Sequence, residues 1–171
     1  MRQIYLLHGK GGSPQGSVAK LEPLLREAHP EYDYHRLMLP HHDPRILAER
    51  SVEYLREFNL MRETHVIGIS LGGLVAAKLQ EASRPDLRVA CVSSPTWADG
   101  VQLLKKPSHR LAIYSSHDEV IADRVSDWPQ LAEAYDLPWL THDTDAHKER
   151  IGQLLNRWIA GEPLAEMAQS L

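Results

Sequence analysis

The strongest constraint on the fold is a regular alternation of short apolar runs and longer amphipathic segments along the 171 residues. The short runs have the composition of buried strands and occupy residues 3–9, 32–40, 64–70, 87–94, 109–116 and 138–143. Apolar residues at helical spacing follow them at 17–29, 43–60, 71–83, 121–135 and 148–161. Because parallel strands need a covering crossover, this order predicts an α/β fold, a three-layer αβα sandwich around a mainly parallel six-stranded sheet.

The domain organisation predicted from this pattern is simple. No repeat, low-complexity tract or linker interrupts the alternation, so we expect residues 1–171 to form one domain with a substantial core. The tail, residues 161–171, is expected either to add a short helix from Pro163 or to fray. The segment from Pro95 to Pro107 has little periodicity and is expected to be a loop with one helical turn.

Composition and charge exclude several classes of partner. The net charge of −4 predicts neither nucleic-acid nor anionic-membrane binding. No run reaches the roughly 18 apolar residues of a membrane span, and the run Ile4–Leu7 is too short for a signal peptide, so we expect a cytoplasmic protein.

The single cysteine, Cys91, lies within an apolar run and is expected to be a core residue. Since no zinc-binding spacing occurs, we expect no metal.

The sequence Gly68-Ile69-Ser70-Leu71-Gly72 lies where a predicted strand passes into a predicted helix. Gly-x-Ser-x-Gly at such a junction is the nucleophile elbow, a strained turn that exposes the serine hydroxyl above the sheet. A serine hydroxyl needs a histidine base and an acid that orients the histidine. In this fold the chain order is the serine, then the acid, then the histidine. Ser115 to Ile121 follows the fifth predicted strand, and His142 to His147 follows the sixth. Both segments therefore lie where the acid and the base are required.

Four segments, LLHGKGGSP, GISLGG, SSHDEVI and DAHKE, resemble the small α/β-hydrolases, a resemblance that covers nearly the whole chain. The chain resembles the capless single-domain members, such as the retinoblastoma-binding-protein-like serine hydrolases and the YqiA-type esterases. The resemblance implies a minimal α/β-hydrolase fold with the strand order 2-1-3-4-5-6 and no cap domain. It also implies a serine esterase or thioesterase that uses no cofactor.

The resemblance assigns roles to individual positions. Ser70 matches the nucleophile, Asp118 the acid, and His147, just before the last helix, the base. Glu119 and Asp123 are rivals for the acid, and His142 is the rival for the base. His142 is disfavoured because the expected strand ends there, which leaves it too early for the loop. His117 is expected to be an ordinary loop side chain.

The loop after the first strand, His8-Gly9-Lys10-Gly11-Gly12-Ser13, matches the family's oxyanion loop. The resemblance implies that the backbone N–H groups of Lys10 and Leu71 form the oxyanion hole. His8 is then a structural residue. Phosphate binding by this glycine-rich loop is a weaker alternative, because neither the Walker A nor the dinucleotide spacing is met.

Two further positions are candidates for substrate binding. Trp97 follows the fourth predicted strand, with a core-edge aromatic as the alternative. His41 follows the second strand, where His41-His42-Asp43 forms either a polar loop with a helix cap or, less favourably, a metal site. The expected partner is a small ester or thioester substrate; the sequence identifies no protein partner. An acyltransferase with the same triad, and a binding protein on a hydrolase fold, remain as alternatives.

Overall fold

The computed structural model describes residues 2–171, and its centre is a six-stranded sheet in which all neighbouring strands are parallel. The strands are β1 (Gln3–Leu7), β2 (Asp33–Leu37), β3 (His65–Ile69), β4 (Arg88–Val92), β7 (Arg110–Tyr114) and β8 (Glu133–Asp136). Their order is β2-β1-β3-β4-β7-β8, which confirms the expected order 2-1-3-4-5-6. The fold class is therefore confirmed.

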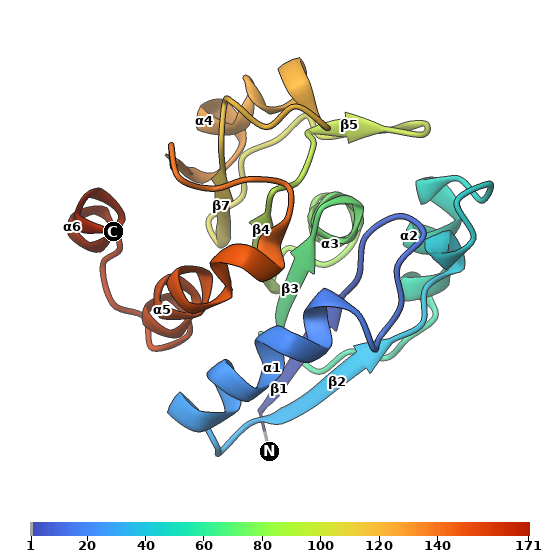
Figure 1. Ribbon diagram of the computed structural model, residues 1–171. Coiled ribbons are helices and arrows are strands. Elements are labelled where there is room, and N and C mark those ends of the chain that lie inside the picture. The colour runs from blue at the N-terminus through green and yellow to red at the C-terminus, as the bar shows by residue number, and fades with distance from the viewer. Residues whose placement is uncertain (1) are drawn as a thin grey trace.

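Helices cover both faces of the sheet and form the two outer layers (Figure 1). One face carries α1 (Ser17–Ala28), α5 (Lys148–Ile159) and the short tail helix α6 (Ala165–Ser170). The other carries α2 (Ala48–Arg56), α3 (Leu71–Ala82) and α4 (Trp128–Leu131). Three short 3₁₀ helices lie in connections: η1 (Pro40–His42), η2 (Ala122–Val125) and η3 (Thr144–His147). Of the two alternatives for the tail, the helix is the one observed.

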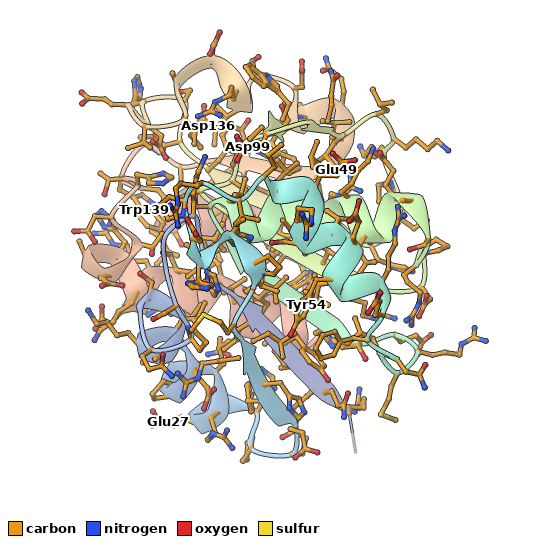
Figure 2. All side chains as sticks on the ribbon, turned by 90° about the vertical axis from the view of Figure 1, so that its right-hand side faces the viewer. Glu27, Glu49, Tyr54, Asp99, Asp136 and Trp139 are labelled. Atoms are coloured by element: carbon orange, nitrogen blue, oxygen red, sulfur yellow. The ribbon has the colours of Figure 1, made fainter. Side chains whose placement is uncertain are left out.

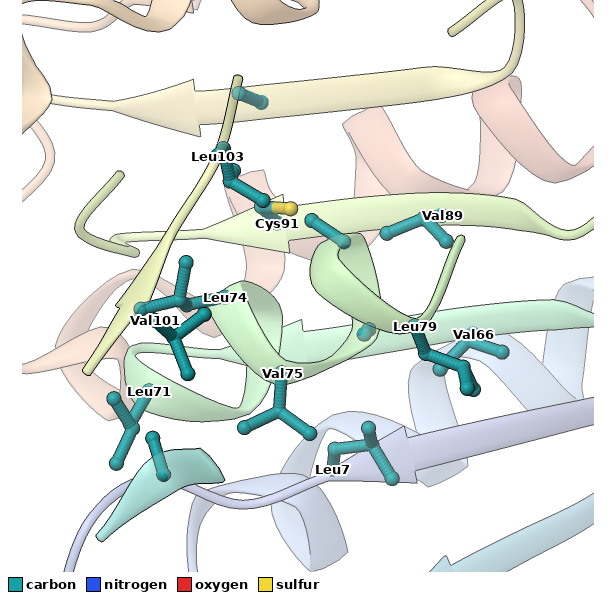
Figure 3. Packing of buried hydrophobic residues seen from close by; sticks show 14 of the residues in the cluster. Leu7, Val66, Leu71, Leu74, Val75, Leu79, Val89, Cys91, Val101 and Leu103 are labelled. Carbon is teal, nitrogen blue, oxygen red and sulfur yellow. The ribbon is translucent and has the colours of Figure 1, made fainter. Parts of the chain in front are cut away.

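Alternating side chains of the central strands supply two cores, one on each side of the sheet. In β4, Val89 and Cys91 pack on the α2–α3 side, whereas Ala90 and Val92 pack on the α1–α5 side. Figure 3 shows the first of these cores, in which α3 residues lie against the strands. Burial on both faces explains why β3 and β4 read as nearly continuous apolar runs.

The structure corrects the predicted elements between residues 121 and 143. In place of one helix over 121–135 there are η2, the four-residue α4 and then β8 at Glu133–Asp136. The predicted strand at 138–143 is wrong, since the last strand, β8, ends at Asp136. As a half-buried edge strand, β8 lacks the apolar run by which a buried strand is predicted from sequence. Leu137 and Leu140 are buried, but in the connection after the strand. This shift moves His142 from a strand end to a position six residues beyond Asp136.

The segment between β4 and β7 forms a small hairpin instead of the expected helical turn. Its strands, β5 (Trp97–Ala98) and β6 (Val101–Gln102), pair antiparallel across Asp99 and Gly100, which have φ of 50° and 82°. Val101 packs beside Leu74 of α3 (Figure 3). The hairpin projects beyond the end of the sheet in Figure 1, and within residues 2–171 no cap domain covers that end.

The second helical segment also begins later than expected. The Asp43 carboxylate accepts a hydrogen bond from the Arg45 N–H, so Asp43-Pro44 forms a turn, and α2 begins at Ala48. Within residues 2–171, no helix has the length and apolar character needed to cross a membrane.

Candidate active site

Ser70 lies at the turn between β3 and α3 with a strained backbone. Its φ and ψ are 52° and −123°, a conformation that L-residues adopt rarely and that functional sites often retain. The turn is held by two hydrogen bonds, from Ser70 N–H to the Val92 carbonyl at 2.8 Å and from Gly73 N–H to the Ser70 carbonyl at 3.0 Å. These are the features of the expected nucleophile elbow.

Two glycines of the motif are required by backbone contacts. A Cβ at Gly68 would lie 2.3 Å from the backbone of Gly72, and a Cβ at Gly72 would lie 2.5 Å from the Leu7 carbonyl oxygen. Both contacts are with backbone atoms, which cannot move aside easily. The glycines therefore let α3 begin directly against β3 and β1, and this close approach fixes the position of Ser70.

The hydroxyl of Ser70 is the first member of a hydrogen-bonded chain of three side chains. Ser70 Oγ lies 3.0 Å from His142 Nε2, and His142 Nδ1 lies 2.9 Å from Asp118 Oδ2. Asp118 is 4% exposed, and its second oxygen accepts hydrogen bonds from the N–H groups of Val120 and Ile121. These two N–H donors fix the orientation of the Asp118 carboxylate, which leaves Oδ2 directed at the imidazole. This arrangement fits a nucleophile, a base and an orienting acid.

The expectation that His147 contacts Ser70 is wrong. His147 Nε2 lies 3.1 Å from Thr141 Oγ1, its ring packs beside Trp139, and the residue ends η3. Because the last strand ends at Asp136, His142 lies well inside the following loop, and its Nε2 reaches Ser70 Oγ at 3.0 Å. The loop is attached to the end of β4 through a hydrogen bond from the Ser93 hydroxyl to the Thr141 carbonyl.

The other candidates near the acid lie outside this chain of hydrogen bonds. Asp118 is the acid position predicted from the sequence, and it is the carboxylate that contacts the histidine. The rivals Glu119 and Asp123 are exposed, as is His117.

The loop after β1 passes directly beside the serine. A Cβ at Gly9 would lie 3.3 Å from Ser70 Cβ, and Lys10 and Leu71 line the same cavity as Ser70. Leu71 is the first residue of α3, where backbone N–H groups have no intrahelical acceptor. The two predicted oxyanion donors therefore belong to segments that border the nucleophile.

His41 does not line this cavity, which corrects its predicted contact with substrate. It is fully buried, with Nε2 lying 2.8 Å from the His8 carbonyl and Nδ1 lying 2.7 Å from the Ser51 hydroxyl. Since a carbonyl only accepts, Nε2 carries the proton, and Nδ1 accepts from Ser51. The His41 carbonyl also accepts the Gly11 N–H at 2.9 Å. His41 thus holds the loop after β1 through two hydrogen bonds, one to His8 and one to Gly11.

His8 is structural, as expected. Its Nε2 accepts the Leu39 N–H at 3.0 Å, so Nδ1 carries the proton and donates to the Gly9 carbonyl at 2.8 Å. Both histidines are neutral in these hydrogen bonds. Burial is the main cause that lowers the pKa of His8, and it lowers the pKa of His41 to about 4.

These buried histidines predict a loss of stability in mild acid. Burial also lowers the pKa of His65 to about 4, with a further contribution from the charges of Arg88 and Arg2. The unfolded chain binds these protons near pH 6.5, so the free energy of unfolding is retained above that pH and falls as the pH decreases to about 4. We expect a loss of about 3 kcal/mol for each of His41 and His65, measured by urea unfolding at several pH values.

Two variants test the origin of this loss. His41→Gln and His65→Gln should each make the free energy of unfolding less dependent on pH, whereas His117→Gln, which changes an exposed residue, should leave the dependence unchanged. A free energy of unfolding that stays constant between pH 7 and pH 4.5 contradicts the assignment.

The cavity above Ser70 has a volume of about 590 Å³. It lies at the carboxyl ends of the strands, the edge where α/β folds bind ligands. Figure 2 shows this end of the molecule, with Asp99 and Asp136 there and Glu27 at the opposite end. The apolar residues that line the cavity come from several elements: Val18, Ile69, Leu71, Pro95, Ala98, Val120 and Ile121.

Trp97 does not line this cavity either, which corrects the second substrate-binding prediction. It is 47% exposed on the hairpin, and the Arg124 guanidinium lies 5.3 Å from the centre of its ring. The side chains that do line the cavity include Arg124 and the ion pair Lys10–Asp99, with Nζ and Oδ2 3.1 Å apart. Sequence reasoning missed Arg124 and Asp99 because the hairpin and η2 were not predicted.

Neither a metal site nor a reactive cysteine accompanies Ser70 in the described residues. In the described part of the chain, no group of three or more His, Cys, Asp or Glu side chains is placed to hold a metal ion. Cys91 is buried in the core, and desolvation raises the pKa of its thiol to about 12, so it is not a nucleophile.

Comparison with known proteins identifies the fold. No protein-family model matches the chain, and no curated protein matches its sequence. Among solved structures, the ydeN gene product from B. subtilis has a TM-score of 0.71 at 16% identity, covering 94% of this chain and 100% of that one. Alpha/beta hydrolase domain-containing protein 10 from mouse has a TM-score of 0.73 at 9% identity, covering 93% and 90%.

Est1E from Butyrivibrio proteoclasticus, solved with bound ferulic acid, has a TM-score of 0.65 at 14% identity, covering 95% of this chain and 89% of that one. At these identities the likeness establishes the fold alone, and the chain has the α/β-hydrolase fold. The closer resemblance to the retinoblastoma-binding-protein-like and YqiA-type enzymes stays a prediction.

Proposed function

We propose that the protein is a serine hydrolase that cleaves small carboxylic esters or thioesters. The single observation that carries this proposal is the continuous chain Ser70–His142–Asp118, with distances of 3.0 and 2.9 Å, on a strained strand-to-helix turn. A chance cluster of polar side chains would not also have a serine at positive φ and an acid held by two backbone N–H groups.

The proposed mechanism follows from the roles of the three side chains. Neutral His142 removes the proton from Ser70 Oγ as the oxygen attacks the acyl carbon. Asp118 holds the imidazole in the required tautomer and stabilises the cation that forms. The backbone N–H groups of Lys10 and Leu71 are proposed to bind the developing oxyanion.

His142 then donates its proton to the leaving oxygen or sulfur, which departs and leaves an acyl group on Ser70. A water molecule attacks the acyl carbon and gives a proton to His142, which passes it to Ser70 Oγ as the bond between that oxygen and the acyl group breaks and the acid leaves. The cycle restores Ser70 and His142 and uses only water as the second substrate, so the proposed mechanism involves no cofactor.

The size of the cavity favours short acyl groups. Residues 2–171 include no cap domain over the end of the sheet where Ser70 lies, so we expect only the first part of a long acyl chain to be buried. Each buried methylene contributes about 0.8 kcal/mol, or roughly fourfold in binding, and exposed methylenes contribute little. We therefore expect a higher kcat/KM for p-nitrophenyl butyrate than for p-nitrophenyl palmitate.

The test compares these two esters with the wild-type protein and Ser70→Ala. Hydrolysis of the butyrate that is lost in the variant supports the proposal. Butyrate cleavage that persists in Ser70→Ala contradicts it, and a kcat/KM that still rises at palmitate contradicts the small-substrate part. Two alternatives give distinct results: an acyltransferase forms a new ester with an added alcohol or thiol, and a binding protein shows no Ser70-dependent turnover.

A further inference from the structure

Arg124 contributes the one charge in the cavity above Ser70 that no opposite charge balances. The other fully charged side chains that line the cavity are Lys10 and Asp99, which pair with each other at 3.1 Å. Among residues 2–171, no carboxylate pairs with Arg124, and its guanidinium N–H groups make no hydrogen bond to protein. Arg124, one of the residues that line the cavity, therefore carries a positive charge and five N–H donors that have no protein partner.

The side chain and backbone of Arg124 are both held in place. The Arg124 carbonyl accepts two hydrogen bonds from Thr96, one from the backbone N–H at 2.7 Å and one from the hydroxyl at 3.1 Å. The guanidinium stacks on Trp97, with 5.3 Å between its carbon and the ring centre. Trp97, predicted to bind substrate, thus positions a residue that lines the cavity. A guanidinium stacked in this way keeps its N–H edge available for a ligand.

The position of Arg124 is also linked to the acid of the triad. The Ala122 N–H donates to the Asp118 carbonyl at 2.9 Å, and the Arg124 N–H donates to the Ile121 carbonyl at 2.9 Å. Ala122 has a φ of 47°, which is strained for this residue. The turn therefore fixes the cation and Asp118 relative to each other within one short segment.

The chemistry of a suitable ligand follows from the residues around this cation. The Arg124 guanidinium matches a carboxylate, which it binds through two parallel hydrogen bonds. The lining also includes apolar side chains, among them Val18, Ile69 and Val120, which suit a short hydrocarbon segment between the anion and the reacting carbonyl. We infer that Arg124 selects esters or thioesters that bear a carboxylate, an inference that rests on the proposed hydrolase function.

The kinetic test uses substrates matched in length and differing in charge. For the acyl side, p-nitrophenyl hydrogen adipate is compared with p-nitrophenyl hexanoate. For the leaving group, the butyrate ester of 4-hydroxyphenylacetic acid is compared with that of its amide. We expect the wild type to favour the anionic member of one pair by about tenfold or more in kcat/KM, and Arg124→Gln to abolish this preference, measured as the ratio of the two kcat/KM values.

Two control variants separate local recognition from general charge. Arg124→Lys keeps the charge and should restore part of the preference. Arg62→Gln removes the same charge next to the start of β3, at the opposite edge of the sheet, and should keep the wild-type preference. Hydrolysis of the neutral esters without preference in either pair overturns the inference while the proposed function stands. An equal loss on neutral and anionic substrates in Arg124→Gln also overturns it.

A binding measurement separates the two proposals further. In Ser70→Ala labelled with ¹⁵N-arginine, adipic acid monoamide or 4-hydroxyphenylacetate should shift the Arg124 Nε signal, identified by its absence in Arg124→Gln. Hexanamide and 4-hydroxyphenylacetamide, which lack the charge, should not. This shift without Ser70-dependent turnover in the wild type would contradict the hydrolase but support the anion site. No shift with either carboxylate overturns the anion site.

Discussion

The His142→Ala variant is expected to lose at least about 10³-fold in kcat on p-nitrophenyl butyrate, because it removes the group that takes the proton from Ser70. His142 Nε2 is 3.0 Å from Ser70 Oγ, and within residues 2–171 no other side chain is hydrogen-bonded to this hydroxyl. The loss should appear in kcat with little change in KM, since the imidazole acts on the reacting atoms rather than on substrate binding.

The matched control is His147→Ala, which changes the histidine that the sequence favoured. His147 contacts Thr141 and Trp139, so its replacement should retain most of the wild-type kcat. Circular dichroism of both variants checks that the fold is intact. A folded His147→Ala that is inactive beside an active His142→Ala would assign the base to His147 and refute the geometry described here.

The Asp118→Asn variant is expected to lower kcat by roughly 10³- to 10⁴-fold while the protein stays folded. The amide retains the size of the carboxylate, but its N–H₂ group can face His142 Nδ1 and favour the tautomer that carries the proton on Nε2. In that tautomer the imidazole cannot accept the Ser70 proton. The measurement is kcat on p-nitrophenyl butyrate as a function of pH.

The neighbouring acids supply the controls for this prediction. Glu119→Gln and Asp123→Asn each remove an exposed carboxylate from the same segment and should leave kcat within about twofold, as expected for surface substitutions. If either neutral variant matched the loss in Asp118→Asn, the acid would be misassigned.

The central part of the fold was predictable because strands that are buried on both faces consist almost entirely of apolar residues. Strands β1, β3, β4 and β7 are short apolar runs, and the glycines around Ser70 mark the strand-to-helix junction. The order of the strands came from the resemblance to a known family and not from the residues. The segments that hold Ser70 and Asp118, the proposed nucleophile and acid, were predicted because each follows one of these well-marked strands, and the choice of Asp118 within its segment came from the resemblance.

His142, the proposed base, was not favoured from the sequence because its predicted position depends on the edge strand. The side chains of β8 are half-buried or exposed, so the strand has no apolar run, and the buried Leu137 and Leu140 produced that signal five residues too late. Once the strand is placed at Glu133–Asp136, loop position no longer disfavours His142. Both histidines fit the required chain order, and only the three-dimensional contact separates them.

The substrate-binding predictions failed for a different reason. His41 and Trp97 both follow strands at the correct edge of the sheet, but a position in a loop does not determine where a side chain points. His41 turns into the core to hold the loop after β1, and Trp97 lies on a hairpin that the sequence did not predict. Arg124 became visible as a candidate only when η2 and the hairpin were seen to border one cavity.

The most direct test of the central claim is labelling with a fluorophosphonate, which reacts with a serine only when a neighbouring base activates its hydroxyl. Intact-mass and peptide-mapping measurements should show one adduct on the wild-type protein, located at Ser70. Labelling should be absent in Ser70→Ala, strongly slowed in His142→Ala and unchanged in His147→Ala. Equal labelling of the wild type and Ser70→Ala, or an adduct mapped to another serine, would contradict the assignment of Ser70 as the nucleophile.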